Sequence, residues 1–509
     1  MFNVINSRIS SVFQCSIIRR GMHLYLIPPV LISAALLSGC ASKLSEKIAS
    51  PATPETSGDF WKPTKSQEQK PVTLPVVNVP PEYNAKINWS LTELVDLALL
   101  TNNTTKTTWY QTRAAAAEAQ SKKGPYYPSV DFDVDTTRIR GSAVGGRFSF
   151  TQTSTTPYLE MTWILFDFGR TRADVNEATQ LLYSANWTHN SAVQNVILQV
   201  QEAYYQYLGA RALLQAQEAT VKSSKTNLDA AQQRHEAGVA TIADVLQAQT
   251  ALSQAQLSVD TTRGQIQILR AELAVATGAP ASIALQMEVI DELPAEIPST
   301  QLAQKVETLI LEAFAKRPDL AAARSTVLAA EANIKKKEAE RYPSLELDAN
   351  VDRLYYLNPV TGSNTYVATL SFRLPLFNGF SRQYDILQAK AEAEAARTSL
   401  AGLQQQVALQ VWTSYTNLNT ATEKIKTTRS LLTSAQQSYD VALGRYQEGV
   451  GNILDVLTAQ TALENARAED VVTRTEWFLS VAQLARDTGT LGMAVDQSGP
   501  VPQTQPKEK

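Results

Sequence analysis

The sequence is poor in the side chains that carry most enzyme chemistry. Its 509 residues include three histidines and two cysteines. It contains no phosphate-binding loop, dinucleotide fingerprint or zinc-ligand spacing. The formal net charge is −3, whereas nucleic-acid binding requires a basic surface. These absences argue against an enzyme, a resident metal or cofactor, and a nucleic-acid partner.

The N-terminal region lacks an apolar run long enough to cross a membrane as a helix. The longest run, Leu24–Leu37, is interrupted by Pro28 and Pro29. Two arginines precede it and Leu-Ser-Gly-Cys ends it at Cys40, which is typical of an export signal. Residues 1–39 thus resemble a lipoprotein signal peptide, whose removal would leave Cys40 as the lipidation site, carrying palmitate. An ordinary signal peptide with an incidental cysteine is the alternative.

Low-complexity segments flank the remaining chain. Residues 40–85 are rich in proline, which fixes φ and removes backbone donors, so they indicate an extended, lipidated tether. Ala41 and Ser42, with no acid at the second position, resemble the outer-membrane address of bacterial lipoproteins. Residues 496–509 indicate a disordered tail.

Two copies of one plan occupy residues 86–295 and 300–495. The stretch RHEAGVATIADVLQAQTAL from Arg234 recurs as RYQEGVGNILDVLTAQTAL from Arg445, with 12 of 19 positions identical at an offset of 211. Each copy predicts a helix, a β-hairpin and a long helical hairpin. The predicted β-hairpins are at about 127–166 and 342–376, and the predicted helical hairpins are at about 170–279 and 381–490.

The first long helical pattern, from Arg170 to about Arg234, contains no proline and one glycine. Its apolar residues recur at spacings of three and four, and a continuous helix of this length would span about 100 Å. A helix of this length cannot fold onto a compact core, so it must pair with other helices along its length. Two shorter helices in a solenoid are the alternative.

Four segments alternate apolar and polar residues, two in each copy. They predict strands of roughly ten residues, separated by the polar loops RIRGSAVGGR and NPVTGSN. Apolar-out strands of this length favour an α+β membrane protein with a transmembrane barrel over a soluble sandwich. The alternation places acidic residues on the lumen side: Asp131, Asp133, Asp135, Glu346, Asp348 and Asp352.

Four strands cannot close a barrel, and lipid does not tolerate an open sheet edge. The chain must therefore form oligomers if it spans a membrane. Two copies would make an eight-strand barrel and three copies a twelve-strand barrel, and strand arithmetic alone does not decide between them.

The duplicated motif carries a family resemblance. Gly238-Val239 precedes Asp244-Val245, and Gly449-Val450 precedes Asp455-Val456; a Leu-Phe-Asn-Gly stretch and the lipoprotein cysteine add to it. Over about residues 85–495 the chain resembles the TolC/OprM family of outer-membrane efflux channels. The resemblance implies a homotrimer with one twelve-strand barrel in the outer membrane and a coiled-helix tunnel in the periplasm. It implies two partners: a periplasmic adaptor and an inner-membrane transporter, which the lipidation suggests is proton-driven.

The resemblance also assigns roles at the duplicated turns. Asp244, Asp455 and Tyr446 match family residues of the periplasmic gate, with the Tyr446 hydroxyl directed toward Asp244, so that Tyr446→Phe should increase leak. The position of a gating arginine is occupied by Gly451. Helix capping alone is the alternative role of the two aspartates. Adaptor docking is expected at Gly238, Val239, Gly449 and Val450.

Two other functions compete with a channel. A non-conducting, lipid-anchored coiled-coil scaffold could span the periplasm, but it has no use for amphipathic strands. An adaptor protein would not be expected to carry a duplicated barrel segment.

Overall fold

The computed structural model describes residues 88–143, 145–282, 288–289, 293–294, 305–357 and 360–492. The predicted signal peptide, the lipidation site at Cys40, the tether and the tail all lie outside these described residues. Everything below concerns the unit Val77–Lys509.

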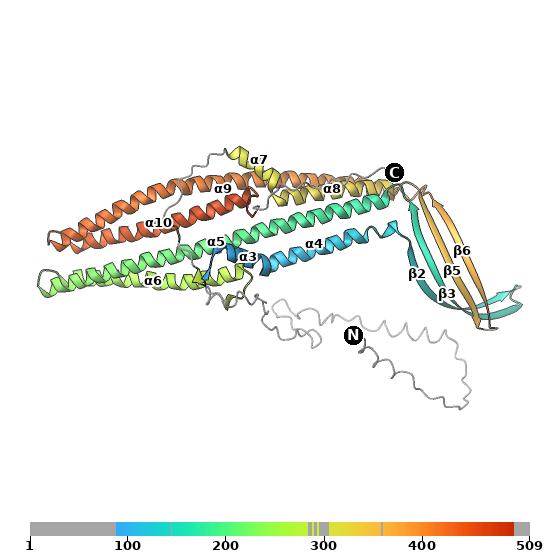
Figure 1. Cartoon of the computed structure of the whole chain (residues 1–509), viewed down its shortest axis with the longest axis horizontal. Helices are drawn as coiled ribbons and strands as arrows, with labels where there is room; N and C mark the ends of the chain where they lie inside the picture. Colours follow the sequence, from blue (N-terminus) through green and yellow to red (C-terminus); the bar gives the residue numbers. More distant parts are fainter. Residues whose placement is uncertain are drawn as a thin grey trace, which may run out of the picture. The chain divides into compact units, whose positions relative to one another are not determined.

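Four antiparallel strands form one sheet in the order β2-β3-β5-β6 (Figure 1). Their bounds are Ser129–Ala143 for β2, Phe148–Phe166 for β3, Ser344–Leu357 for β5 and Val360–Arg373 for β6. A second, two-stranded sheet pairs β1 (Asn88–Trp89) with β4 (Glu288–Val289) in parallel.

The strands are longer than the predicted ten residues, at 15, 19, 14 and 14. Most of the two predicted loops is strand: Arg138 pairs with Thr153, Arg140 with Thr151, and Gly362 with Tyr355. The prediction was wrong because it followed the apolar face alone. Backbone pairing continues where both faces become polar, since the ladder needs only N–H and C=O groups.

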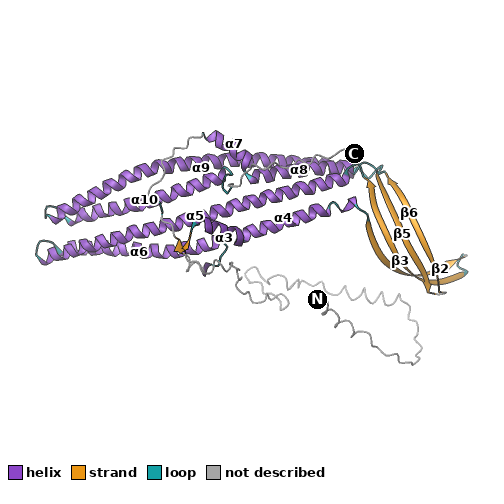
Figure 2. Cartoon of the chain, viewed as in Figure 1, coloured by secondary structure: helices purple, strands orange, loops and turns teal. Residues whose placement is uncertain are grey.

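The helices repeat in the same order in both copies, as Figure 2 shows in purple. The first copy has α3 (Leu91–Thr101), α4 (Asn103–Ser121), the short 3-10 helix η1 (Gly124–Tyr126), α5 (Arg170–Glu236) and α6 (Ile242–Ala276). The second has α7 (Val306–Lys316), α8 (Pro318–Ala339), α9 (Ser381–Gln447) and α10 (Ile453–Asp487). Among the described helices, none combines the length and the apolar character needed to cross a membrane.

Helix α5 is continuous over 67 residues, as is α9, which rules out the solenoid alternative. Its start is fixed by Asp167, whose carboxylate accepts hydrogen bonds from the backbone N–H groups of Gly169 and Thr171 at 3.1 and 2.7 Å. Along its length α5 packs against α4, α8, α6 and α10. The turns α5–α6 and α9–α10 lie at the end of the helices that is remote from the sheet (Figure 1).

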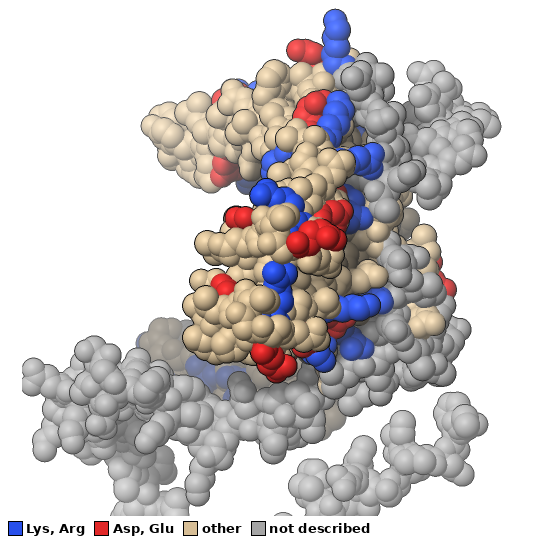
Figure 3. All heavy atoms as spheres, turned by 90° about the vertical axis from the view of Figure 1, so that its left-hand side faces the viewer, with Lys and Arg blue, Asp and Glu red and all other residues tan. Residues whose placement is uncertain are grey.

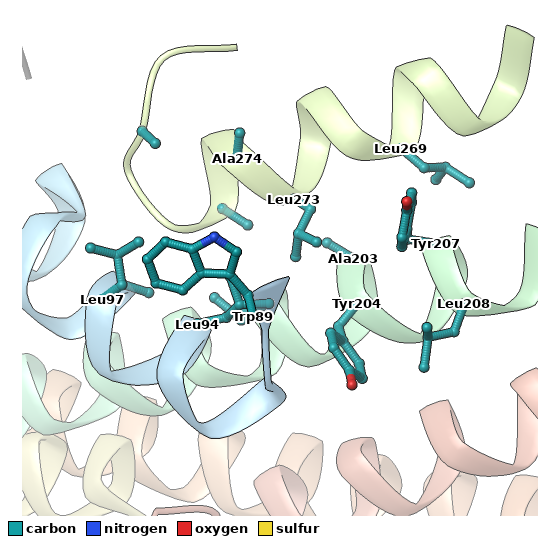
Figure 4. Close-up of a cluster of buried hydrophobic side chains, with 14 of the residues drawn as sticks. Trp89, Leu94, Leu97, Ala203, Tyr204, Tyr207, Leu208, Leu269, Leu273 and Ala274 are labelled. Atoms are coloured by element: carbon teal, nitrogen blue, oxygen red, sulfur yellow. The ribbon is translucent and has the colours of Figure 1, made fainter. Parts of the chain in front are cut away.

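The largest apolar cluster joins α3, α5 and α6. Trp89, Leu94, Leu97, Tyr204 and Leu273 are almost fully buried in it, and Figure 4 shows their side chains converging between these helices. Each large apolar side chain removed from water contributes about 1.5–3 kcal/mol. A matching cluster in the second copy joins α7, α8, α9 and α10. Both long helices are therefore held by paired helices rather than standing alone.

Candidate functional site

The sheet register collects the acidic residues predicted for the lumen on one face. Asp131 lies opposite Glu160 and Asp133 opposite Tyr158, while Asp352 follows on the next strand opposite Tyr158. Directly paired residues point to the same side of a sheet, and alternate residues along a strand do likewise. That face therefore holds Asp131, Asp133, Asp135, Glu346, Asp348 and Asp352, together with Glu160.

The opposite face of the sheet is apolar and open. Its large side chains are exposed, for example Phe132 at 66% and Phe372 at 68%. Exposed apolar patches of this kind mark interaction surfaces for protein or membrane. The strand ends that join the helices carry aromatic residues: Phe168 stacks on Tyr342 at 5.4 Å between ring centroids, and the Trp163 Nε1–H donates to the Tyr126 carbonyl at 3.2 Å.

The two turns at the far end of the helical hairpins share one backbone geometry. We call residues 234–244 the first tip and residues 445–455 the second tip. Gly238 and Gly449 have φ of +79° and +77°, in the left-handed region that glycine adopts without steric cost. In each tip the glycine N–H donates three residues back, to His235 or Tyr446, and the following valine N–H donates five back, to Arg234 or Arg445. These are Schellman motifs, which end both helices in the same way.

The aspartates of the two tips have different surroundings. Asp244 forms a capping box with Thr241: its carboxylate accepts the Thr241 backbone N–H at 2.8 Å, and its own N–H donates to the Thr241 hydroxyl at 3.3 Å. The second helix is capped instead by Asn452, which leaves Asp455 exposed in the first turn of α10. Within one chain, Asp244 therefore has the helix-capping role that was the alternative to a gate role, and Asp455 does not.

Tyr446 contacts the first tip through Arg234, not Asp244. The guanidinium lies over the tyrosine ring at 4.7 Å from its centroid, and its Nη1 donates to the Tyr446 carbonyl at 2.6 Å. Tyr446 is only 6% exposed, and its hydroxyl has no hydrogen-bond partner among the described residues. The hydrogen bond toward Asp244 that the resemblance implied is therefore not made in this structure.

Burial raises the pKa of Tyr446; the nearby Arg234 charge opposes this rise and Asp244 adds to it. The hydroxyl consequently stays protonated at neutral pH and carries no charge that could hold a cation. The electrostatic link between the two tips comes from Arg234.

Sequence reasoning missed Arg234 as a site residue, although it opens the duplicated motif. It was missed because the resemblance places a gating arginine at position 451, which is Gly451 here. A Cβ at Gly451 would lie 2.9 Å from the Tyr446 backbone nitrogen, so this site has no room for a larger side chain without movement. The cation next to Tyr446 is supplied by the other tip.

The predicted docking residues lie on the two tips. Val239 is 66% exposed and Val450 is 70% exposed, and Ile242 and Leu454 are exposed beside them. Figure 3, which faces these turns, shows basic and acidic side chains interspersed on the described surface, with neither sign covering it. The tips therefore present apolar side chains on a face of mixed charge.

A duplicated chain with an amphipathic sheet and long helical hairpins defines a subunit of a membrane channel. The chain belongs to the outer membrane efflux protein family, whose model matches residues 94–279 and 309–490. The family consists of transport proteins of the outer membrane.

Individual relatives agree with this assignment. Protein CyaE of Bordetella pertussis is 27% identical over 424 residues, which cover 83% of this chain and 88% of that protein. The toluene efflux pump outer membrane protein TtgC of Pseudomonas putida is 27% identical over 334 residues, covering 63% and 66%. A membrane protein structure from Pseudomonas aeruginosa superposes with a TM-score of 0.72 at 23% identity, covering 78% of this chain and 93% of that one. That likeness confirms the predicted fold class.

Proposed function

We propose that this chain is the outer-membrane exit channel of a tripartite efflux or secretion system. It passes substrates from an inner-membrane transporter and a periplasmic adaptor to the outside of the cell. The observation that carries the proposal is the four-strand sheet with one acidic and one open apolar face, continued by two helical hairpins of matching geometry. The efflux role named for the relative TtgC supports export of small molecules.

The functional unit that we propose is a homotrimer. Strands β2 and β6 are the two edges of the four-strand sheet, and each presents unpaired backbone groups that lipid cannot satisfy. Pairing β6 of one copy with β2 of the next would close a twelve-strand barrel from three copies. Its apolar face would meet lipid, and its acidic face would line the lumen.

The remaining attachments are also proposals. Cys40 would carry the lipid anchor in the outer membrane. The exposed Val239 and Val450, with Gly238 and Gly449, would dock the adaptor, and the inner-membrane transporter would be proton-driven. Replacing Gly449 by arginine should abolish crosslinking to the adaptor, because φ there is +77°, which L side chains rarely adopt, and because the new cation would stand beside Arg234. Crosslinking that persists would contradict docking at this tip.

The tips would form the periplasmic gate, with Asp244 and Asp455 repeated three times around its mouth and Tyr446 packed behind them. Mutual repulsion or cation binding at these carboxylates would respond to salt.

Single-channel conductance of the purified trimer in planar bilayers tests the function. We expect small, cation-selective openings that enlarge when Asp244 and Asp455 are both changed to alanine. Asp229→Ala, which removes an exposed acid from the body of α5, should leave them unchanged. No conductance from folded trimers of any variant would favour the scaffold function.

A further inference from the structure

Arg234 ties the first tip to the second within one chain. Its Nη1 donates to the Tyr446 carbonyl at 2.6 Å, across 212 positions of sequence. That carbonyl is one of the last of helix α9, where the helix dipole places partial negative charge and favours a cation. The guanidinium also covers the tyrosine ring, at 4.7 Å. One arginine thus supplies a hydrogen-bond donor to the C-terminal end of α9 and joins the two helical hairpins.

The duplication gives this contact a counterpart. At the offset of 211, Arg234 corresponds to Arg445, and Tyr446 corresponds to His235. The acceptor is a backbone carbonyl, so the exchange of tyrosine for histidine keeps it. The His235 carbonyl accepts the Gly238 N–H at 2.8 Å, as the Tyr446 carbonyl accepts the Gly449 N–H at 3.1 Å.

The donor of this counterpart has no partner within the chain. Arg445 is exposed, and its guanidinium has no hydrogen bond or ion pair with any described residue. His235 is exposed too; its Nδ1 lies 3.0 Å from the Ala240 carbonyl, which orients the ring at the surface of the first tip. We call the contact of a tip arginine with a backbone carbonyl of another tip a latch. The donor and the acceptor of a second latch are therefore both present on one chain, on different tips and out of contact.

We infer that Arg445 of each chain donates to the backbone carbonyl of His235 of the partner subunit. In the proposed ring, first tips and second tips alternate. One rotation step places each first tip on the second tip of its own chain. The same step places each second tip on the first tip of the next chain. The Arg234–Tyr446 contact then maps onto Arg445 and the partner's His235. Three latches within chains and three between chains would close the ring of tips. The inference rests on the proposed trimer.

Crosslinking between introduced cysteines tests this contact in the full-length trimer. A short bis-maleimide, whose spacer replaces the arginine side chain, is applied to the double variant Arg445→Cys with His235→Cys. We expect a covalent trimer on a denaturing gel. The matched control is Arg234→Cys with Tyr446→Cys, which should crosslink within the chain and stay at monomer mass. The parent chain, which keeps Cys15 and Cys40, provides the baseline.

The oligomeric state of each sample is measured separately by light scattering before the crosslinker is added. A trimer that yields no covalent trimer, while the control pair reacts, would overturn the latch between subunits and leave the proposed channel intact. A monomer by light scattering would overturn the trimer, and the inference with it.

Alanine variants test the same contact through the conductance of the channel, without introduced cysteines. Arg445→Ala should raise the open probability of the channel roughly tenfold, as should Arg234→Ala, because each removes a charge-assisted hydrogen bond. Arg429→Ala removes an exposed arginine from the same helix α9 and should have no effect. An effect of Arg234→Ala alone would show that the ring is latched only within chains.

Discussion

At the scale of single residues, Tyr446 makes its contacts through its ring and its backbone carbonyl, while its hydroxyl makes no hydrogen bond with the described residues. The ring packs under Arg234 and the carbonyl accepts from it, but the buried hydroxyl has no partner among the described residues. A buried, unpaired polar group costs about 1–3 kcal/mol. The aromatic ring and the backbone carbonyl of Tyr446 therefore matter more for this contact than its hydroxyl group.

This distinction separates two substitutions at position 446. Tyr446→Phe keeps the ring and the carbonyl, so we expect unchanged conductance and unchanged vancomycin uptake, in contrast to the leak expected from the family resemblance. Tyr446→Leu removes the aromatic surface under the guanidinium and should increase both. Leak through the phenylalanine variant would show that the hydroxyl finds a partner in the trimer.

At the scale of elements, a buried ion-pair cluster joins the start of α8 to the end of α10. Arg317 binds Asp319 through two hydrogen bonds, at 3.0 and 2.6 Å, and also donates to the Asp487 carbonyl at 3.2 Å. Burial alone would raise the pKa of Asp319, but the hydrogen bonds and charge of Arg317 outweigh it and hold that pKa below 3.8. A carboxyl of this kind stabilises the fold above its unfolded pKa, and this stabilisation is lost as the pH falls through the folded pKa.

We therefore expect Asp319→Asn to lower the thermal midpoint at pH 7, by an equivalent of about 2 kcal/mol, because Asp487 remains as a second partner of the buried Arg317. The difference from the parent chain should shrink as the pH falls below about 3.8. Glu312→Gln, which breaks the half-exposed pair with Lys316 on α7, should cost less than 0.5 kcal/mol. A constant difference across this pH range would exclude the ion pair as its cause.

The sequence predicted the elements better than their contacts. The absence of proline between Arg170 and Arg234, together with apolar spacings of three and four, favoured one unbroken helix over two shorter ones. A period of two was enough to place Asp131 and Asp352 on one face. Strand length was underestimated, since pairing through Arg138 and Arg140 leaves no trace in hydrophobicity. The contact of Arg234 with Tyr446 joins positions 212 apart, and no local pattern encodes such a distance.

At the scale of the whole molecule, the acidic face of the sheet sets the expected ion preference. Six predicted lumen acids per chain, repeated by the proposed threefold symmetry, would give a negative interior that attracts cations. Arg138 and Arg353 lie on the opposite face of the sheet, whereas Arg373, at the end of β6 that joins the helices, is a basic residue on the acidic face.

Neutralising Asp131, Asp133 and Asp348 together as asparagine should reduce the reversal potential measured across a salt gradient toward zero. The same change at Asp260, an exposed acid on α6, should leave that potential unchanged. Anion selectivity of the parent channel would contradict a lumen lined by this face.

The packing of α10 against α5 has a consequence for the order in which the chain can reach its native state. Helix α5 is synthesised early, and its hairpin with α6 involves only neighbours in sequence. Part of its remaining surface receives α10, and the buried Gln194 side chain on α5 donates to the carbonyls of Gly489 and Leu491. Long-range contacts of this kind form slowly and leave apolar surface open in the meantime. The first half of the chain therefore remains vulnerable to aggregation and proteolysis until α10 and the segment up to Leu491 have emerged.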